Sequence, residues 1–432
     1  HLQVMFDQCK ALIIGLQKRG AVVGSSLNTA YLLERLSQTL ERLETLMAIF
    51  VSNRYLPRRI LLLTGCFARA AAERHSISRL WKQSSGLMAR SVTQNAGDHG
   101  EHYITRDKKE YWAMFYSAAG GGVLIALMAL FKTYLGSIID DKVWKGIAEG
   151  LNYGLGFMVI FMLHFTVATK QPAMTAARFA EAVEKTPQGK TVNMKLAQLL
   201  VDVFRSQSIA VLGNVLIAMG LAALIAFGYQ YKTGEPLMNA DQIAYQLHSI
   251  DPFAGTLWFA AIAGVWLFCS GIISGYFDNR SNYLNMRMRL AQHPLLKKLM
   301  SEKTRVKFAN YMHENYGSLI GNLCFGMLLG ITGVVGYLTH LPLDIRHVAF
   351  SSANVGYIAV SGHFTYSLLL QCIGFVLLIG LVNLIVSFSL TLWVALRSLN
   401  AEIDSWWPIW HEVCQIVKKR PLSLFLPVQL DK

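Results

Sequence analysis

The stretch FTYSLLLQCIGFVLLIGLVNLIVSFSLTLWVAL, residues 364–396, contains no Lys, Arg, Asp or Glu. Because about 20 apolar residues of helix cross the hydrocarbon core of a bilayer, this stretch predicts a transmembrane helix that tilts or extends beyond the membrane. Five other, shorter stretches are also free of charged residues and long enough to cross. Together they predict six transmembrane helices, at about residues 112–131, 151–169, 207–229, 253–277, 316–338 and 364–396.

The overall composition agrees with a membrane protein. The chain has 432 residues, of which 53% are hydrophobic and only 15% charged, yet its net charge is +14. This composition excludes the disordered, collagen-like and disulfide-rich classes. A soluble nucleic-acid binder with such a charge would be richer in charged residues, and six strongly apolar segments exceed what one soluble core holds. We therefore expect an all-α integral membrane protein.

The distribution of Lys and Arg predicts how the helices are oriented. Basic residues concentrate in two of the loops, with six in residues 170–206 and eight in residues 278–315. The other three loops, 132–150, 230–252 and 339–363, hold only three, one and one. Because cytoplasmic loops carry the basic excess, both termini and the two basic loops are predicted to be cytoplasmic. The six helices then form three hairpins, and the net charge indicates orientation and attraction to anionic head groups.

Three domains follow from this pattern. Residues 1–105 predict a cytoplasmic helical domain, because leucines recur at helical spacing from Leu32 to Leu46 with charged residues between them. Residues 106–400 form the six-helix transmembrane domain. Residues 401–432 predict an amphipathic tail at the membrane surface, with three tryptophans followed by a basic cluster. Since the sequence begins with His1, we also expect further chain upstream.

Polar residues at membrane depth are the first candidates for function. Asn214, Asn322, Asn383 and His164 stand in apolar surroundings. Each needs a hydrogen-bond partner, because lipid offers none. Bonds between helices and a polar pathway for a substrate are both compatible with this pattern. The lack of charged residues in the spans argues against a proton-coupled pump and leaves a carrier of lipid or another apolar molecule.

Small residues and one repeated motif suggest how the helices pack. Gly271-x-x-x-Gly275, Gly317-x-x-x-Gly321 and Gly326-x-x-x-Gly330 predict close approach of helix backbones, or a hinge in a moving helix. The runs beginning Gly213-Asn214 and Gly321-Asn322 resemble each other. We interpret this similarity as a sign of hairpin duplication.

The third outer loop, residues 339–363, holds a candidate catalytic group. Asp344 and Arg346 can pair locally, and His347 could act as a general acid or base or as a metal ligand. The same residues could instead order the loop. Neither this lone His nor the spacing of the six cysteines indicates a metal site, and no cofactor motif occurs. We therefore expect no metal and no cofactor.

Four motifs carry a resemblance to a known family. They are ATKQPAMTA at 168–176, SGYFDN at 274–279, PLDIRHVAFSSANVGY at 342–357 and VNLIVSFSL at 382–390. Over roughly residues 100–430 the chain resembles Gram-negative bacterial membrane proteins of the Gcr type, labelled "site-specific recombinase". The resemblance implies the bacterial inner membrane as the location. The motif residues that we single out as candidates are Lys170, Gln171, Pro172, Asp278, Asn279, Arg280, Ser351 and Asn354.

Three functions remain open at this stage. The sequence favours a membrane transport or scaffold protein, whose cytoplasmic domain binds a protein partner and whose basic face binds lipid head groups. The family label implies instead a membrane-anchored recombinase that binds DNA, with the basic loop between Tyr283 and Tyr311 as the place of contact. The third is an outer-face enzyme using Asp344, Arg346 and His347. No catalytic set for strand exchange is recognisable.

Overall fold

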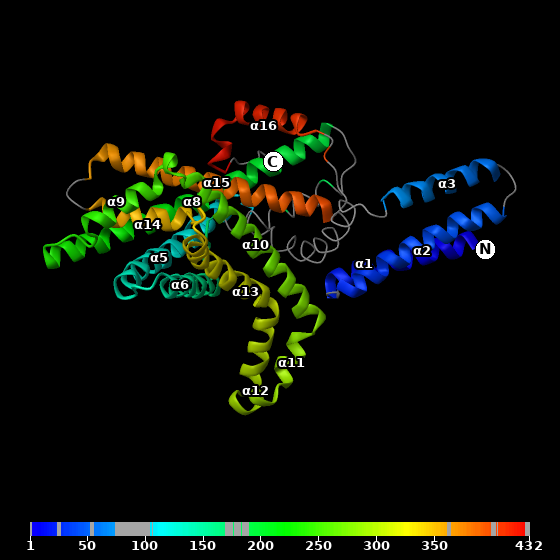
Figure 1. Ribbon diagram of the computed structural model, residues 1–432, viewed down its shortest axis with the longest axis horizontal. Coiled ribbons are helices and arrows are strands. Elements are labelled where there is room, and N and C mark those ends of the chain that lie inside the picture. The colour runs from blue at the N-terminus through cyan, green and yellow to red at the C-terminus, as the bar shows by residue number, and fades with distance from the viewer. Residues whose placement is uncertain are drawn as a thin grey trace. The chain divides into compact units, whose positions relative to one another are not determined.

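The computed structural model describes residues 2–23, 27–51, 56–73, 104–168 apart from 106, 190–360, 364–398 and 405–427, with a few isolated positions. All regular elements in these ranges are helices (Figure 1). They fall into two compact units, which we describe separately. The first comprises residues 1–95, 276–316 and 397–399, and the second comprises the rest.

Five of the described helices are long and apolar enough to cross a membrane: α5 (Lys108–Ile138), α8 (Lys190–Thr233), α10 (Thr256–Tyr283), α13 (Glu302–Thr339) and α15 (Tyr366–Ser398). They contain the first, third and fifth predicted spans and all but the first residues of the fourth and sixth. The prediction of an all-helical protein with apolar helices compatible with a membrane is thus confirmed. A sixth crossing and the orientation of the helices stay predictions.

The second predicted span, residues 151–169, was misplaced. The helix α6 runs from Lys142 to Met162 and so begins earlier and ends earlier than predicted. Asp141 caps its first turn by accepting hydrogen bonds from the amides of Val143 and Trp144, 2.9 Å each. At the other end His164 adopts the left-handed conformation, with φ 58°, which stops the helix. The apolar pattern continues past this point, and hydropathy alone therefore overextends the helix.

The predicted outer loop 339–363 was also wrong in part, since it contains the helix α14 (Val348–Ala359). Ten of its twelve residues are buried. It packs against α5, α8 and α9 (Ala240–Ile250) (Figure 1). A helix of this length is too short to cross a bilayer, and for that reason hydropathy assigned its residues to a loop.

Glycines bring α6 and α13 into close contact. A methyl group placed on Gly326 would overlap the backbone of Gly154, and one placed on Gly330 would overlap the backbone of Gly150. The sequence pattern indicated the Gly326–Gly330 pair but not the matching glycines of α6. Contacts of this kind let two helix backbones touch without side chains between them. The α6–α13 contact is therefore one of the tightest in the second unit.

Shorter elements complete the two units. In the second, η2 (Pro252–Ala254) precedes α10, and α16 (Trp407–Lys419), which packs against α8, leads into η3 (Pro421–Leu424). In the first, α1 (Leu2–Val23) packs on α2 (Leu27–Val51), which also contacts α3 (Leu56–Glu73). An ion pair between Lys10 and Glu44 joins α1 to α2. The elements α11 (Met286–Gln292) and α12 (Pro294–Leu299) carry basic residues of the loop 278–315.

Candidate functional site

Asn383, on α15, holds the backbone where the chain enters α14. Its side chain is fully buried, and its Nδ2 donates hydrogen bonds to the carbonyls of Ala260 (2.7 Å) and Arg346 (3.0 Å). Its Oδ1 accepts a hydrogen bond of 3.1 Å from the amide of Val348, the first residue of α14. First-turn amides have no partner within their own helix, so Asn383 supplies one. One side chain thus ties α10, α15 and the non-helical segment 340–347 together.

Asn214, on α8, does the same for the non-helical segment 163–168. It is also fully buried, and its Nδ2 donates to the carbonyls of Ala118 on α5 and Thr166, the latter at 2.9 Å. Its Oδ1 accepts from the amide of Ala168 at 2.8 Å. Both asparagines therefore satisfy backbone groups that no helix satisfies, which is the condition for irregular backbone inside an apolar bundle.

The other two polar candidates behave differently. Asn322 is buried on α13, and its Nδ2 donates to the Ser318 carbonyl of its own helix at 2.8 Å. His164 lies beyond the end of α6 with an exposed side chain, and its carbonyl accepts a hydrogen bond from Ser117 Oγ at 3.0 Å. Of the four, only Asn214 and Asn383 are shown linking separate segments in this three-bond pattern.

The predicted pairing of Asp344 with Arg346 is present. Arg346 Nη1 lies 2.6 Å from Asp344 Oδ2, and Arg346 Nε donates to the Ser249 carbonyl at 2.8 Å. The guanidinium carbon also lies 5.4 Å from the ring centroid of Phe259, a distance that allows a cation–π contact. Arg346 therefore fixes the segment 340–347 against α9 and α10.

His347 does not join these charges. Its ring lies among Phe157, Phe325 and Phe350, with centroid distances of 6.4, 5.9 and 6.0 Å. Burial lowers the pKa of His347 to about 4, and the imidazole is accordingly neutral at pH 7. No group of three or more His, Cys, Asp and Glu able to hold a metal occurs among the described residues. The expected trio Asp344, Arg346 and His347 is thus divided between a charged contact and an aromatic cluster.

A series of side chains along α6 connects this cluster with two cavities. They occur at every fourth position: Lys145, Glu149, Tyr153, Phe157 and Phe161. Such spacing places one side chain on each successive turn of the helix. The first two line one cavity, the next two are buried, and the last lines a second cavity.

The cavity that we call the Lys132 cavity has a volume of about 300 Å³. Its walls come from the end of α5, the start of α6, α9 and Asn354 of α14, and they contribute Lys132, Lys145, Glu149, Asp241 and several amides. Lys132 Nζ lies 3.4 Å from Glu149 and 5.7 Å from the ring centroid of Tyr153. The walls of the cavity therefore include two lysines and two carboxylates, which the uncharged spans did not suggest.

The second cavity, which we call the Ser117 cavity, has a volume of about 280 Å³. It lies at the opposite end of α6, between the first half of α5 and the segment 163–168. Its lining includes Glu110, Ser117, Phe161 and His164. Between the two cavities, Tyr153 packs on Phe350 with a centroid distance of 4.5 Å, and Phe157 packs on Phe325 at 5.0 Å. An aromatic cluster thus separates the two cavities.

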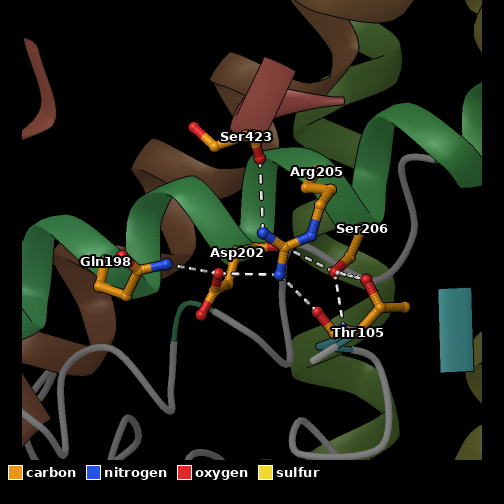
Figure 2. Close-up of polar contacts among 6 residues, drawn as sticks. All are labelled: Thr105, Gln198, Asp202, Arg205, Ser206 and Ser423. Atoms are coloured by element: carbon orange, nitrogen blue, oxygen red, sulfur yellow. Dashed lines mark hydrogen bonds and ion pairs between the residues drawn. The ribbon is translucent and has the colours of Figure 1, made fainter. Parts of the chain in front are cut away.

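A second polar group, built around Arg205, secures both ends of the second unit to α8 (Figure 2). Arg205 is buried, and its Nη2 donates to the Thr105 carbonyl at 2.7 Å and pairs with Asp202 at 2.8 Å. Its Nη1 donates to the Ser423 carbonyl at 3.4 Å. Ser206 Oγ accepts from the Thr105 amide at 2.8 Å. This group therefore links the segments at Thr105 and Ser423 to α8.

The remaining candidates lie in other places. Ser351 and Asn354 are on α14, and of these only Asn354 reaches the Lys132 cavity. Asp278, Asn279 and Arg280 form the last turns of α10, where Arg280 Nη1 lies 3.5 Å from the Tyr276 hydroxyl. Lys170, Gln171 and Pro172 lie outside the described residues. The described candidate motif residues therefore lie on two different helices, α14 and α10.

Comparison with known proteins identifies the family but no individual relative. Neither the curated proteins nor the solved structures contain a match to this chain. A family model described as "Site-specific recombinase" matches residues 1–427. The match extends the resemblance seen in the sequence to the N-terminal helices as well. The chain belongs to the site-specific recombinase family.

Proposed function

We propose that this protein is a multi-pass protein of the bacterial inner membrane that moves a small polar solute along α6. The predicted topology has three hairpins, with both termini in the cytoplasm. In that topology the Lys132 cavity, at the end of α5, is on the outer side, and the Ser117 cavity is on the cytoplasmic side. The cytoplasmic helical domain and the basic loops would bind a protein partner and anionic lipid.

The observation that carries this proposal is the series of residues along α6. It leads from a charged cavity, through Tyr153 and Phe157, to a second cavity at the other end of the same helix. A transporter needs two such openings and a closed barrier between them. The charged lining of the Lys132 cavity favours a polar solute over the apolar one that the spans alone suggested.

A scaffold would need no such route, and this difference sets the test. The six native cysteines are first replaced by Ala. Single cysteines are then placed in the Lys132 cavity (Gln246→Cys), in the Ser117 cavity (Ala113→Cys) and in the barrier (Phe157→Cys). A membrane-impermeant methanethiosulfonate reagent is added to right-side-out and to inside-out vesicles, and modification rates are measured.

A transporter predicts that residue 246 reacts from outside only, that residue 113 reacts from inside only, and that residue 157 reacts slowly from both sides. The matched control is Ile379→Cys on α15, which is equally buried but away from α6, and it should not react. Ile160→Cys repeats the barrier test with a smaller loss of side-chain volume. A closed scaffold is indicated if the barrier positions react from neither side while both cavities do. Reaction of residue 379 at the same rate would reveal local unfolding instead of transport.

The family label favours a second candidate, a membrane-anchored protein that binds DNA. The hairpin of α10 to α13 supports it with basic residues outside the apolar windows: Arg280, Arg287, Arg289, Lys297, Lys298, Lys303, Arg305 and Lys307. Phosphate contacts would make such binding fall steeply with salt. The purified protein should then bind a DNA duplex at low salt and lose affinity when Arg287 and Arg289 are replaced by Gln. Absence of binding at low salt would eliminate this candidate.

A further inference from the structure

Asn214 and Asn383, which hold non-helical backbone, make the same pattern of hydrogen bonds. In both cases the carbonyl and the amide that the asparagine binds are two residues apart, at Thr166 and Ala168 for Asn214 and at Arg346 and Val348 for Asn383. In both cases its second Nδ2 bond goes to a carbonyl of another long helix.

The order of elements along the chain is also the same. A long helix that offers a carbonyl (α5 or α10) is followed by a second helix (α6 or α13), then by the non-helical segment, and later by the helix that carries the asparagine (α8 or α15). Each second helix is followed by a histidine in the left-handed conformation, His164 with φ 58° and His340 with φ 56°. These are two of only three non-glycine residues with positive φ in the described chain.

The two sets differ in the number of residues between the two carbonyls that each asparagine binds. From Ala118 to Thr166 is 48 residues, whereas from Ala260 to Arg346 is 86. Residues 276–316, which are assigned to the first unit, lie within the longer interval, and their length is enough to cover the whole difference. The second set of helices is thus the first set with an arm inserted between its first two members.

The contact between α6 and α13 supplies an independent check. If His164 corresponds to His340, then Gly150 corresponds to Gly326 and Gly154 to Gly330. The close contacts join Gly154 to Gly326 and Gly150 to Gly330. Exchanging corresponding residues turns each contact into the other, which is the property of two equivalent surfaces related by a twofold axis. The glycine contact therefore lies on the axis that relates the two sets.

We propose that α5–α6–α8 and α10–α13–α15 are inverted structural repeats, and that segments 163–168 and 340–347 are equivalent hinges facing opposite sides of the membrane. Each repeat contains three helices, and in the predicted topology α5 begins at the cytoplasmic side and α10 at the outer side. An axis through the α6–α13 contact then lies in the membrane plane. Asn214 and Asn383 fix the backbone of the two hinges.

This proposal differs from the duplication suggested by the sequence. There Asn214 was matched with Asn322, on the first helices of two hairpins. Asn322 donates to a carbonyl of its own helix and is not shown in the three-bond pattern. The structural counterpart of Asn214 is Asn383.

The test uses two leucines next to the histidines. Leu163 and Leu341 have exposed side chains and flank the ends of α6 and α13. Leu163→Cys and Leu341→Cys are made in the full-length cysteine-free chain and treated with a membrane-impermeant maleimide in oriented vesicles. Inverted repeats predict at least tenfold faster labelling of residue 163 from the cytoplasmic side and of residue 341 from the outer side.

Labelling of both residues from the same side, or of neither from water, would overturn the proposal. Ser405→Cys, in the C-terminal tail, is the control that reports which face of the membrane the reagent reaches in each vesicle preparation. These outcomes are separate from those of the transport test. If residue 157 reacts from neither side, transport is contradicted but the inverted repeats are not. If residues 163 and 341 are both labelled from the same side, the inverted repeats are contradicted but transport along α6 is not.

Discussion

In segments 163–168 and 340–347 a buried asparagine binds backbone groups outside the helices, but the additional contacts of the two segments differ. In both, a buried asparagine satisfies an amide and a carbonyl that no helix satisfies. Around the first segment the additional support is neutral, since Ser117 Oγ contacts the His164 carbonyl and the Thr166 hydroxyl. Around the second it is ionic, through Arg346.

This difference shows which part of the arrangement is essential. The asparagine bonds recur because backbone groups in an apolar bundle must be satisfied. The outer supports vary, because they set how firmly each hinge is held. The second segment also leads directly into buried α14, whereas the first opens onto the Ser117 cavity. We therefore expect segment 340–347 to be the more rigid of the two.

The largest effect is expected at the glycine contact that relates the two repeats. Gly330→Leu should lower stability by more than about 3 kcal/mol, because overpacking a backbone contact leaves no side chain that can move aside. Gly333→Leu is the matched control, since nothing lies within 4 Å of a Cβ at that position. Thermal unfolding in detergent micelles measures both. Equal midpoints for the two variants would contradict the close contact.

The next largest effect is expected at the asparagines. Asn214→Ala and Asn383→Ala each remove three hydrogen bonds from buried backbone groups. At about 1 kcal/mol for each group left unsatisfied, both should lose about 3 kcal/mol of stability. Asn322→Ala is the control and should leave hydrogen exchange at 166–168 and 346–348 unchanged, because Asn214 and Asn383 hold the Ala168 and Val348 amides. Hydrogen exchange should rise at 166–168 in the first variant and at 346–348 in the second. A response at Asn322 as large as at Asn214 would favour the pairing suggested by the sequence.

A smaller effect should separate the two hinges. Arg346→Met removes an ion pair, a hydrogen bond to the Ser249 carbonyl and a contact with Phe259. Because Asp344 stays partly exposed to solvent, we expect a loss of about 1–2 kcal/mol. Exchange should rise at residues 344–348 and stay unchanged at 163–168. If the first segment responded as strongly, the hinges would not be independently supported.

The smallest effect is expected at the neutral support. Ser117→Ala removes hydroxyl contacts with His164 and Thr166 but leaves both bonds from Asn214 to the segment. A loss of about 1 kcal/mol should follow, as is usual for one hydroxyl. The backbone bond from the Thr166 amide to the Ser117 carbonyl, 3.1 Å, remains. A larger loss than for Arg346→Met would reverse the expected order of rigidity.

The sequence predicted the features that depend on local composition. Charge-free runs located five of the long helices, and the spacing of Asp344 and Arg346 indicated their pairing. The sequence misplaced the end of α6, because nothing in an apolar run predicts that a histidine adopts the left-handed conformation. It missed α14, because an apolar helix of this length is too short to cross a bilayer and was assigned to a loop between spans.

The candidate site depended on features that sequence patterns do not reveal. The aromatic cluster at His347 joins α6, α13 and α14, and the Lys132 cavity joins α5, α6, α9 and Asn354. The four-residue spacing from Lys145 to Phe161 is present in the sequence. It indicates a route along α6 only once the structure shows that its two ends line cavities. Likewise, the correspondence of Asn214 with Asn383 requires knowing which carbonyls they bind.

A cryo-EM structure in a lipid nanodisc tests most directly whether the two sets of helices are inverted repeats. We predict that α5–α6–α8 superimposes on α10–α13–α15 by a rotation of about 180°, as inverted repeats require, about an axis in the membrane plane. That axis should pass between the Gly150–Gly330 contact and the Gly154–Gly326 contact, and Asn214 should fall on Asn383. An axis along the membrane normal, or a superposition that instead places Asn214 on Asn322, would contradict the account.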